Sequence, residues 1–441
     1  MTTVRPHHRI IGGSIGTFVE WYDFLIYSLS APVLARHFFP ASNEVASLLG
    51  TFGIYAIAFF MRPLGGLFFG RLGDRHGRVP ILSVTVLSMG AATMVMGLLP
   101  TYGSVGLWAT ALLLLCRLVQ GFAVGGETSG GMSYVLESAP PDRRGRWVGV
   151  VGATAFLPAA VAALFVLALR NAFGDQGYLT WAWRIPFLAG ALLAVVGLWL
   201  RRRLDDPEEF LEASREAQHD SPDRPSRKLR LKSITTVVLL ISVMAVSGYL
   251  LSSYFYTFLV GTARLGATAA LLSNAAAIVV VFVLLPVGGA LSDRIGRKPL
   301  LIGGTLWLLA GAYPAMKLAS SGTVAGAFAG QVVLAIGIAS VHAGGFVAML
   351  ELFPTATRYS GHALAYNLGF AVFGGTTPLI ASALVSGTGS TLAPAFYLMA
   401  AAVLGLLVAL RTPETRGVSL RSAADRDRDR EAPAERLSSG N

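Results

Sequence analysis

The chain has 441 residues, of which 54% are hydrophobic and only 13% are charged, and its formal net charge is +11. Soluble domains carry roughly 25% charged residues, so this composition excludes an ordinary soluble protein and predicts a membrane protein with many spans. The single cysteine excludes an internal disulfide.

Apolar segments of membrane-spanning length recur along the whole chain, separated by short polar connections. The first segment contains Glu20 and Asp23, which the apolar region of a cleavable signal peptide would not carry, so we expect a retained span. The predicted spans cover residues 10–35, 47–70, 79–99, 105–136, 145–170 and 184–200, and then 234–261, 266–288, 299–319, 323–352, 357–385 and 390–410.

The longest polar connection, residues 201–233, divides these spans into two equal sets and is predicted to be a cytoplasmic linker. We therefore predict an all-α integral membrane protein with twelve transmembrane helices, in two pseudo-symmetric six-helix halves over residues 1–200 and 234–411. The tail, residues 412–441, contains alternating acidic and basic residues without apolar heptads, and we expect it to be disordered and cytoplasmic.

The basic residues are distributed unevenly over this topology. An even number of spans places both termini on one side, and the segments on that side hold most of the 35 Lys and Arg residues. The positive-inside rule then predicts cytoplasmic termini and a location in the cell inner (plasma) membrane. Because the net charge reflects topology, we do not expect nucleic acid as a partner. The expected partners are the lipid bilayer, a small-molecule substrate and protons, and we expect the protein to be a monomer.

Two repeated motifs relate the halves. The sequences from Gly70 to Pro80 and from Gly289 to Pro299 share Gly, Leu, Asp, Arg, Gly, Arg and Pro at matching positions, each copy between two apolar spans. A second motif, Leu-Glu followed by Pro and then Arg, ends the fourth span and the tenth span. Duplication around a central cleft is how many secondary transporters achieve alternating access.

The charged residues of both motifs fall on the predicted cytoplasmic side. We interpret them as ion pairs that hold this side closed and break when it opens; the alternative is that they set the topology and cap helices. The candidate cytoplasmic gate consists of Asp74, Arg75, Arg78, Glu137 and Arg144 in the first half and Asp293, Arg297, Glu351 and Arg358 in the second.

The Gly-x-Leu-x-Asp-Arg-x-Gly-Arg pattern, present twice in a chain of twelve spans, resembles the major facilitator superfamily. The resemblance covers nearly all of residues 10–411 and implies a helical bundle with the substrate between its halves near mid-membrane. It extends to the metabolite:proton symporter branch, which contains permeases for α-ketoglutarate, citrate, shikimate and proline/betaine. The segments similar to that branch are Glu20-Trp21-Tyr22-Asp23-Phe24, Arg62-Pro63-Leu64-Gly65-Gly66, Arg117-Leu118-Val119-Gln120-Gly121, Gly125-Gly126-Glu127, Trp183-Arg184-Ile185-Pro186-Phe187 and Glu351-Leu352-Phe353-Pro354-Thr355.

Ionisable residues inside spans are costly, and this makes them candidates for function. Glu20 and Asp23 share one face of the first helix, and Arg117, Gln120 and Glu127 share one face of the fourth. A carboxylate that exchanges an arginine partner for a proton would link substrate flux to proton flux. The proton-coupling candidates are Asp23 and Glu127, which we prefer, together with Glu20, and Arg117 is their partner; the alternative is that some of them form fixed structural pairs.

A further group of polar residues is suited to contact the substrate. Arginines would meet a carboxylate, and Tyr and Asn offer hydrogen bonds with apolar surface; the competing interpretation is that such residues join helices. His342, in the middle of the tenth span, is able to titrate or to pack as a hydrogen-bonded residue. The substrate-binding candidates are Arg62, Arg117, Gln120, Tyr27, Tyr249, Asn274, His342 and Asn367.

The leading interpretation is a secondary active transporter that carries a small polar metabolite, preferably an organic acid, together with protons. The alternatives are a symporter of a zwitterionic osmolyte such as proline or betaine, and an exporter of a secondary metabolite. The sequence has no phosphate-binding Gly-x-x-x-x-Gly-Lys-Ser/Thr loop and no catalytic or metal-binding constellation. These features disfavour ATP-driven pumping and a membrane enzyme, and we expect no cofactor or metal.

Overall fold

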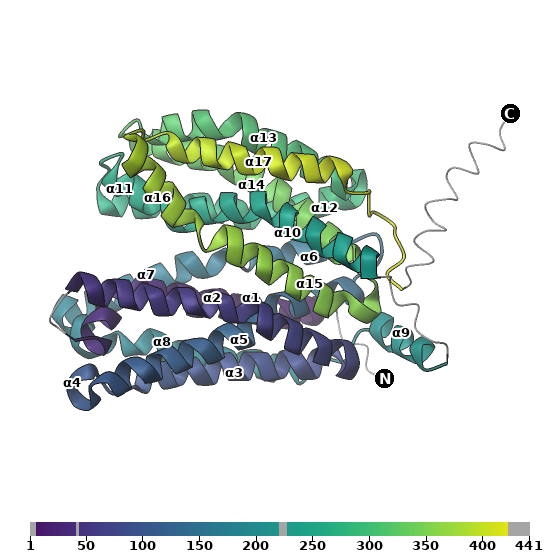
Figure 1. Ribbon diagram of the computed structural model, residues 1–441, viewed down its shortest axis with the longest axis horizontal. Helices are drawn as coiled ribbons and strands as arrows, with labels where there is room; N and C mark the ends of the chain where they lie inside the picture. The colour runs from purple at the N-terminus through teal and green to yellow at the C-terminus, as the bar shows by residue number, and fades with distance from the viewer. Residues whose placement is uncertain (1–5, 41–43, 220–226, 422–441) are drawn as a thin grey trace.

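The computed structural model describes residues 6–40, 44–219 and 227–421. All regular structure in this part of the chain is helical, and the long helices run side by side along the molecule (Figure 1). The first half forms the lower layer in Figure 1 and the second half forms the upper layer. Both ends of the described chain and α9 (Glu208–His219) lie at the right-hand end, which we call the terminal face.

The first half contains six long helical units. One of them is broken into α6 and α7, and Pro158 lies near the start of α7, where the missing N–H of proline is tolerated. The units are α1 (Pro6–Phe38), α2 (Glu44–His76), α3 (Arg78–Leu98), α5 (Leu107–Ser138), α6 (Arg144–Ala153) with α7 (Leu157–Gly177) and the π-helical turn η1 (Tyr178–Ala182), and α8 (Arg184–Arg201); the short α4 (Tyr102–Val105) precedes α5.

The second half repeats this arrangement with two further interruptions. The π-helical turns η2 (Leu250–Tyr254) and η3 (Phe370–Gly374) divide its first and fifth units, and such turns are frequent at functional sites. The units are α10 (Arg227–Tyr249) with η2 and α11 (Phe255–Gly261), α12 (Ala267–Ile295), α13 (Arg297–Ala319), α14 (Val324–Glu351), α15 (Thr355–Gly369) with η3 and α16 (Thr377–Thr388), and α17 (Ala393–Arg411).

The predicted twelve-helix bundle is confirmed. Eleven helical segments of the described chain are long and apolar enough to cross a membrane. The twelfth unit, α1, has 33 residues and runs beside the others, although Glu20 and Asp23 lower its hydropathy (Figure 1). A span of about 20 residues suffices to cross the hydrocarbon core, so α1 is long enough.

The repeated glycine motif explains the tightest turns of the bundle. Gly77, between α2 and α3, has φ 104°, and Gly296, between α12 and α13, has φ 106°. Residues with a side chain rarely adopt this conformation, so glycine lets the chain reverse between the two helices at each of these positions without a longer loop. The turns bring the charged residues of both copies of this motif to the terminal face.

The halves meet through two matched helix pairs. α2 of the first half packs against α15 of the second, and α6 of the first half packs against α12 of the second. The expectation of a disordered tail is wrong for residues 412–421, because Thr412, Thr415 and Leu420 are buried against the bundle. The rest of the predicted disordered tail, residues 422–441, lies outside the described residues.

Candidate functional site

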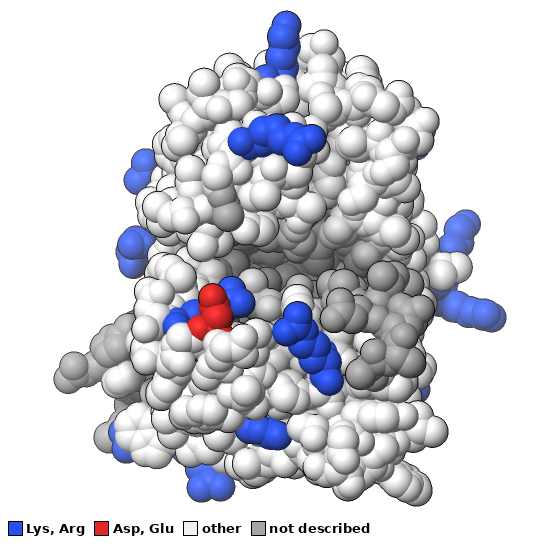
Figure 2. All heavy atoms as spheres, turned by 90° about the vertical axis from the view of Figure 1, so that its left-hand side faces the viewer, with Lys and Arg blue, Asp and Glu red and all other residues white. Residues whose placement is uncertain are grey.

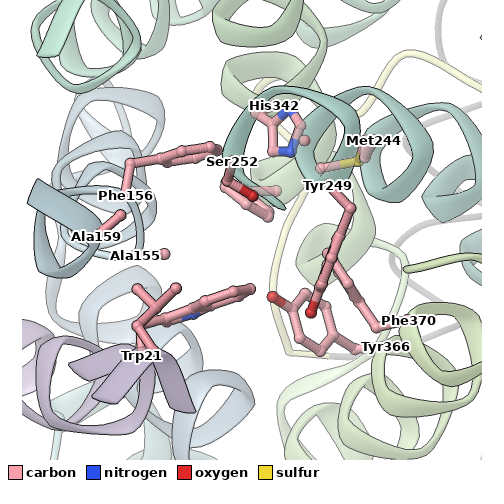
Figure 3. Close-up of a pocket in the computed structure, with 13 residues that line it drawn as sticks. Trp21, Ala155, Phe156, Ala159, Met244, Tyr249, Ser252, His342, Tyr366 and Phe370 are labelled. Carbon is pink, nitrogen blue, oxygen red and sulfur yellow. The ribbon is translucent and has the colours of Figure 1, made fainter. Parts of the chain in front are cut away.

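A pocket lies between the two halves (Figure 3). It encloses about 490 Å³ of space not filled by atoms, part of which is open to solvent. On the side opposite the terminal face, the surface is hollowed between the layers and shows few charged side chains (Figure 2). The pocket walls include Trp21 and Phe156 from the first half and Tyr249, His342, Tyr366 and Phe370 from the second.

Aromatic rings form most of the walls of this pocket. The ring centroid of Tyr249 lies 6.0 Å from that of Trp21 and 6.2 Å from that of Phe370, and Phe156 packs edge-on against His342 at 5.7 Å. The described residues that line the pocket include no Asp, Glu, Lys or Arg. This wall suits a small molecule whose net charge is zero, because no charged side chain lines it.

A smaller cavity lies on the other side of α1, inside the first half. Glu20, Asp23, Arg117 and Gln120 line it, whereas Trp21 faces the central pocket. The structure therefore brings together four of the predicted site residues. Thr93 donates a hydrogen bond to Asp23 at 2.7 Å and in turn accepts one from Gln120 at 2.6 Å. The second carboxylate oxygen of Asp23, Oδ1, has no hydrogen-bond partner among the described residues.

The two arginines of this region are held differently. Arg62 pairs with Glu20 at 3.5 Å. Arg117 is 1% exposed, donates to Gln120 at 2.7 Å and lies over the ring of Tyr27 at 4.2 Å, but it forms no ion pair within the described chain. A buried charge without a partner is unfavourable. Asp23 lies within electrostatic range of Arg117, so an ionised Asp23 offsets part of this charge.

Glu127, a preferred proton carrier from the sequence, lies in a different environment. It forms a buried ion pair with Arg201, whose Nη1 lies 3.1 Å from Oε2, and Thr85 also donates to it. Arg201 donates a further bond to the carbonyl of Gly12, so the pair joins α1, α3, α5 and α8. Arg201, predicted as the first residue of the linker, is instead the last residue of α8 and is 1% exposed.

The second-half candidates divide into pocket residues and residues that join helices. Tyr249 and His342 line the pocket. Asn274 instead donates to Gln331 and to the carbonyl of Leu251, both at 2.8 Å. Asn367 joins the two halves, because it donates to the carbonyl of Gly125 at 2.7 Å.

Tyr27 is also outside the central pocket. Its hydroxyl donates to the carbonyl of Thr51 at 3.1 Å, and its ring supports the guanidinium of Arg117. It thus contacts Arg117 and joins α1 to α2.

A buried charged cluster closes the terminal face. Glu137 binds Arg78 of its own half, with Nη2 at 3.0 Å, and Arg358 of the other half, with Nη1 at 2.6 Å. Arg78 also donates to the carbonyl of Thr355, again across the halves, at 2.9 Å. One carboxylate therefore connects α3 and α5 to α15.

Two aspartates make matched contacts between the halves. Asp74 accepts from the backbone N–H groups of Tyr359 at 3.3 Å and Ser360 at 3.0 Å in α15. Asp293 accepts from those of Gly145 at 2.7 Å and Arg146 at 2.9 Å in α6. A carboxylate near the start of a helix is stabilised by the positive end of the helix dipole. Asp293 therefore binds the start of a helix in the opposite half. Asp74 binds the fifth and sixth residues of α15, so it also joins the two halves.

The remaining gate candidates do not follow the same symmetry. Glu351 binds Arg297 at 3.1 Å and accepts from Thr415 at 2.6 Å. Arg144 donates to the carbonyl of Val418 at 3.0 Å. No ion pair between Glu351 and Arg144 occurs in the described part of the chain. Arg75 is exposed and forms no ion pair there.

Sequence reasoning missed two carboxylates that bind helix starts. Asp206 accepts from the N–H groups of Arg78 at 2.7 Å and Val79 at 2.8 Å. Glu414 accepts from those of Arg297 at 2.9 Å and Lys298 at 3.0 Å. Each follows the last span of its half, which is the signal that could have located them.

These two carboxylates have opposite pKa shifts. Burial raises the pKa of Asp206 although two backbone N–H groups oppose this change. Burial also disfavours ionisation of Glu414, but the backbone N–H donors, those of Arg297, Lys298 and Arg416 among them, outweigh it and lower its pKa.

The aromatic residues of the first half that line the pocket are also missing from the predicted site. Trp21 and Phe156 were not among the predicted site residues, although Trp21 stands between the two acids of α1. An aromatic residue in an apolar span gives no signal of its own, since most such residues face lipid or the core.

Comparison with known proteins decides the family. The model of the Major Facilitator Superfamily matches residues 13–288, and that of the sugar (and other) transporter family matches residues 199–425. The chain belongs to the Major Facilitator Superfamily. Members of this superfamily are transporters, so the protein is a multi-pass membrane transporter and not an enzyme.

Relatives from this superfamily extend over almost the whole chain. A proline/betaine transporter of Salmonella typhimurium is 34% identical over 428 residues, which are 94% of this chain and 85% of that protein. A glycine betaine/proline/ectoine/pipecolic acid transporter of Dickeya dadantii is 33% identical over 433 residues, 95% of this chain and 85% of that protein. The proton:xylose symporter XylE bound to 6-bromo-6-deoxy-D-glucose shares the fold, with a TM-score of 0.76 and 18% identity over 94% of this chain and 97% of XylE.

Proposed function

We propose that the protein is a proton-coupled symporter that imports a small zwitterionic osmolyte of the proline and betaine kind. The observation that carries the choice of substrate is the central pocket, whose described walls contain no charged side chain. A zwitterion has no net charge, and its two opposite charges can be met by ring faces and hydroxyl groups. The names of the relatives in Salmonella typhimurium and Dickeya dadantii support the same class of substrate.

The organic acid that the sequence analysis preferred is the second candidate. One observation favours it: Nε and Nη2 of Arg117 have no hydrogen-bond partner among the described residues. A substrate carboxylate would be a suitable partner for this guanidinium. Arg117 nevertheless lines the cavity behind α1 and not the central pocket, so we rank the zwitterion first.

Asp23 is the proton carrier that the geometry supports best. It is 3% exposed, and within the described chain its Oδ1 has no hydrogen-bond partner and the nearby Arg117 forms no ion pair. Ionised Asp23 balances the charge of Arg117; protonated Asp23 leaves Arg117 free to interact elsewhere. Glu20 and Glu127 are weaker candidates, because Arg62 and Arg201 already bind them.

The terminal-face cluster then acts as the cytoplasmic gate. Its contacts between the halves, centred on Glu137, Asp74 and Asp293, must break before the pocket can open on this side. The orientation that fits the positive-inside rule puts the terminal face and both termini in the cytoplasm and the protein in the inner membrane.

The function can be tested with the purified full-length chain in proteoliposomes. We expect radiolabelled betaine or proline to accumulate when the lumen is alkaline relative to the bath, and a protonophore to abolish the accumulation. Citrate, α-ketoglutarate and shikimate are the matched competitors. Accumulation of one of these acids without any uptake of betaine or proline would overturn the choice of substrate, and protonophore-insensitive accumulation would overturn the coupling.

A further inference from the structure

The central pocket has the composition of a site for an ammonium group without an acidic partner. Six aromatic residues contribute to its walls: Trp21, Phe156, Tyr249, Phe346, Tyr366 and Phe370. They come from five different helical units, so the rings surround the space instead of forming one flat stack (Figure 3). The nearest carboxylates on α1, those of Glu20 and Asp23, face the separate cavity behind the helix.

An ammonium ion in such a site has to be stabilised by the rings. The face of an aromatic ring is electronegative, and it attracts a cation placed within about 6 Å of its centroid, with Trp the most effective ring. Methyl groups on the nitrogen spread the charge and add apolar surface, which fits apolar walls better than a hydrated –NH₃⁺ group does. The neighbouring Met244 and Ala159 add apolar contacts that a methylated head can use.

The same pocket offers hydrogen-bond donors for the opposite end of a zwitterion. The hydroxyl of Tyr249 is buried and has no partner among the described residues. In Figure 3 the hydroxyls of Tyr249 and Tyr366 point toward the same part of the pocket. Two phenol O–H groups can donate to one carboxylate, and a buried donor left without an acceptor costs free energy that a bound carboxylate would recover.

We infer that the ring cage formed by Trp21, Phe156 and Tyr249 is the subsite for a methylated ammonium head, and that the tyrosine hydroxyls receive the carboxylate of the same molecule. The inference deepens the proposed function and rests on it for the class of substrate. It further specifies that affinity requires the positive charge of the head and not only its shape.

A pair of isosteres tests the role of the charge in the unmodified protein. Glycine betaine and 3,3-dimethylbutanoate have the same shape and the same carboxylate, but a carbon atom replaces the charged nitrogen in the second compound. We expect betaine to bind the purified full-length protein in nanodiscs at least about tenfold more tightly than 3,3-dimethylbutanoate, the least that a desolvated cation–π contact should give. Equal affinities would overturn the inference.

Substitution of the cage tests its location. Trp21→Leu should weaken betaine binding by at least about tenfold, and Trp21→Phe, which keeps an aromatic face, should retain most of the affinity. Trp108→Leu is the matched control, because Trp108 is 73% exposed on α5 and lies outside the pocket. Betaine affinity that is unchanged in Trp21→Leu, or equally weakened in Trp108→Leu, would contradict the assignment.

Equilibrium binding separates this inference from the proposed function, because it needs no proton gradient. If betaine binds with the expected preference but is not accumulated under a pH gradient, the subsite stands and the coupling fails. If betaine is accumulated but the isostere binds equally well, the proposed function stands and the ring cage is wrong.

Discussion

Glu137 of α5 and Arg358 of α15 form an ion pair across the two halves at 2.6 Å, whereas their counterparts in the repeated motif, Glu351 and Arg144, form none in the described chain. The two copies of this motif therefore form different contacts although their sequences match. The residues 412–421 account for part of the difference, because Thr415 and Val418 bind Glu351 and Arg144 separately. We therefore expect closure of the terminal face to depend more on Glu137 than on Glu351.

Glu137→Gln should open the terminal face more than Glu351→Gln does. The first substitution removes the negative charge shared by two buried arginines, Arg78 and Arg358, and one of these contacts joins the halves. Breaking a buried pair by neutralising one partner costs about 3–5 kcal/mol at most, and less where the amide keeps a hydrogen bond. The second substitution leaves every inter-half ion pair in place.

Spin labels at Arg71→Cys and Ile295→Cys, in a Cys116→Ala background, measure this opening. Residues 71 and 295 are exposed near the terminal ends of α2 and α12, one in each half. The inter-label distance should lengthen in Glu137→Gln and change less in Glu351→Gln. Equal shifts in both variants would show that the two carboxylates are equivalent.

Asp74→Asn should move the same distance distribution in the same direction. The substitution removes the charge that faces two backbone N–H groups of α15 and abolishes the ion pair with Arg78, whose Nη1 lies 2.7 Å from Asp74. Asp142→Asn is the control, because Asp142 is exposed and its one ion pair among the described residues is with its neighbour Arg143 at 3.5 Å. Unchanged distances and transport rate in Asp74→Asn would argue that the motif only sets topology.

Gly125→Ala should destabilise the first half. A methyl group at this position would collide with the backbone carbonyl of Arg62 in α2, and backbone cannot move aside as a side chain does. Overpacking of this kind costs about 1–3 kcal/mol. Gly53→Ala in α2 meets no atom within 4 Å and is the matched control. Thermal denaturation in detergent should show a lower midpoint for Gly125→Ala only; equal midpoints would contradict the close α2–α5 approach.

His342→Phe should distinguish substrates that carry an N–H group from those that do not. The Nδ1 atom of His342 lies 2.8 Å from the carbonyl of Ile338, which can only accept, so Nδ1 holds the proton and Nε2 of the neutral ring is an acceptor. Proline has N–H groups that can donate to this acceptor, and betaine has none. Competition assays should show weaker proline binding with little change for betaine, and a parallel loss of both ligands would contradict the prediction.

The contacts at the starts of α3 and α13 should respond differently to acidification. The pKa of Glu414 is lowered, so its contribution to stability is present above the ordinary pKa of Glu and is lost only as the pH falls through the folded-state value. The pKa of Asp206 is raised, so Asp206 becomes protonated above its ordinary pKa, and its ionisation costs stability as the pH rises through that window.

Hydrogen exchange followed by mass spectrometry, corrected for the intrinsic pH dependence, can compare the two helix starts. On acidification, protection at Arg78 and Val79 should change at a higher pH than protection at Arg297 and Lys298. Glu414→Gln should remove the pH response of α13 only. A response of both helices at the same pH would contradict the opposite shifts.

The sequence predicted the fold well because span length and repeated motifs are local signals. Apolar length identified the helices, and the matched Gly77 and Gly296 identified the duplication. The site was predicted less completely, because its geometry depends on which face of each helix turns inward. In the sequence, Glu127 and Asp23 are equivalent as acids inside a span. The packing of α8 shows that Arg201 forms an ion pair with Glu127, whereas Asp23 forms no ion pair among the described residues.

Proton movement during transport tests the central claim most directly. Proteoliposomes that contain a pH-sensitive dye, held at zero membrane potential, should acidify inside when betaine is added to vesicles with the wild-type protein. Asp23→Asn should exchange labelled for unlabelled betaine without any acidification, and Glu127→Gln, if its fold is retained, should still acidify the lumen. Betaine accumulation without acidification by the wild type, or acidification by Asp23→Asn at the wild-type rate, would contradict proton symport through Asp23.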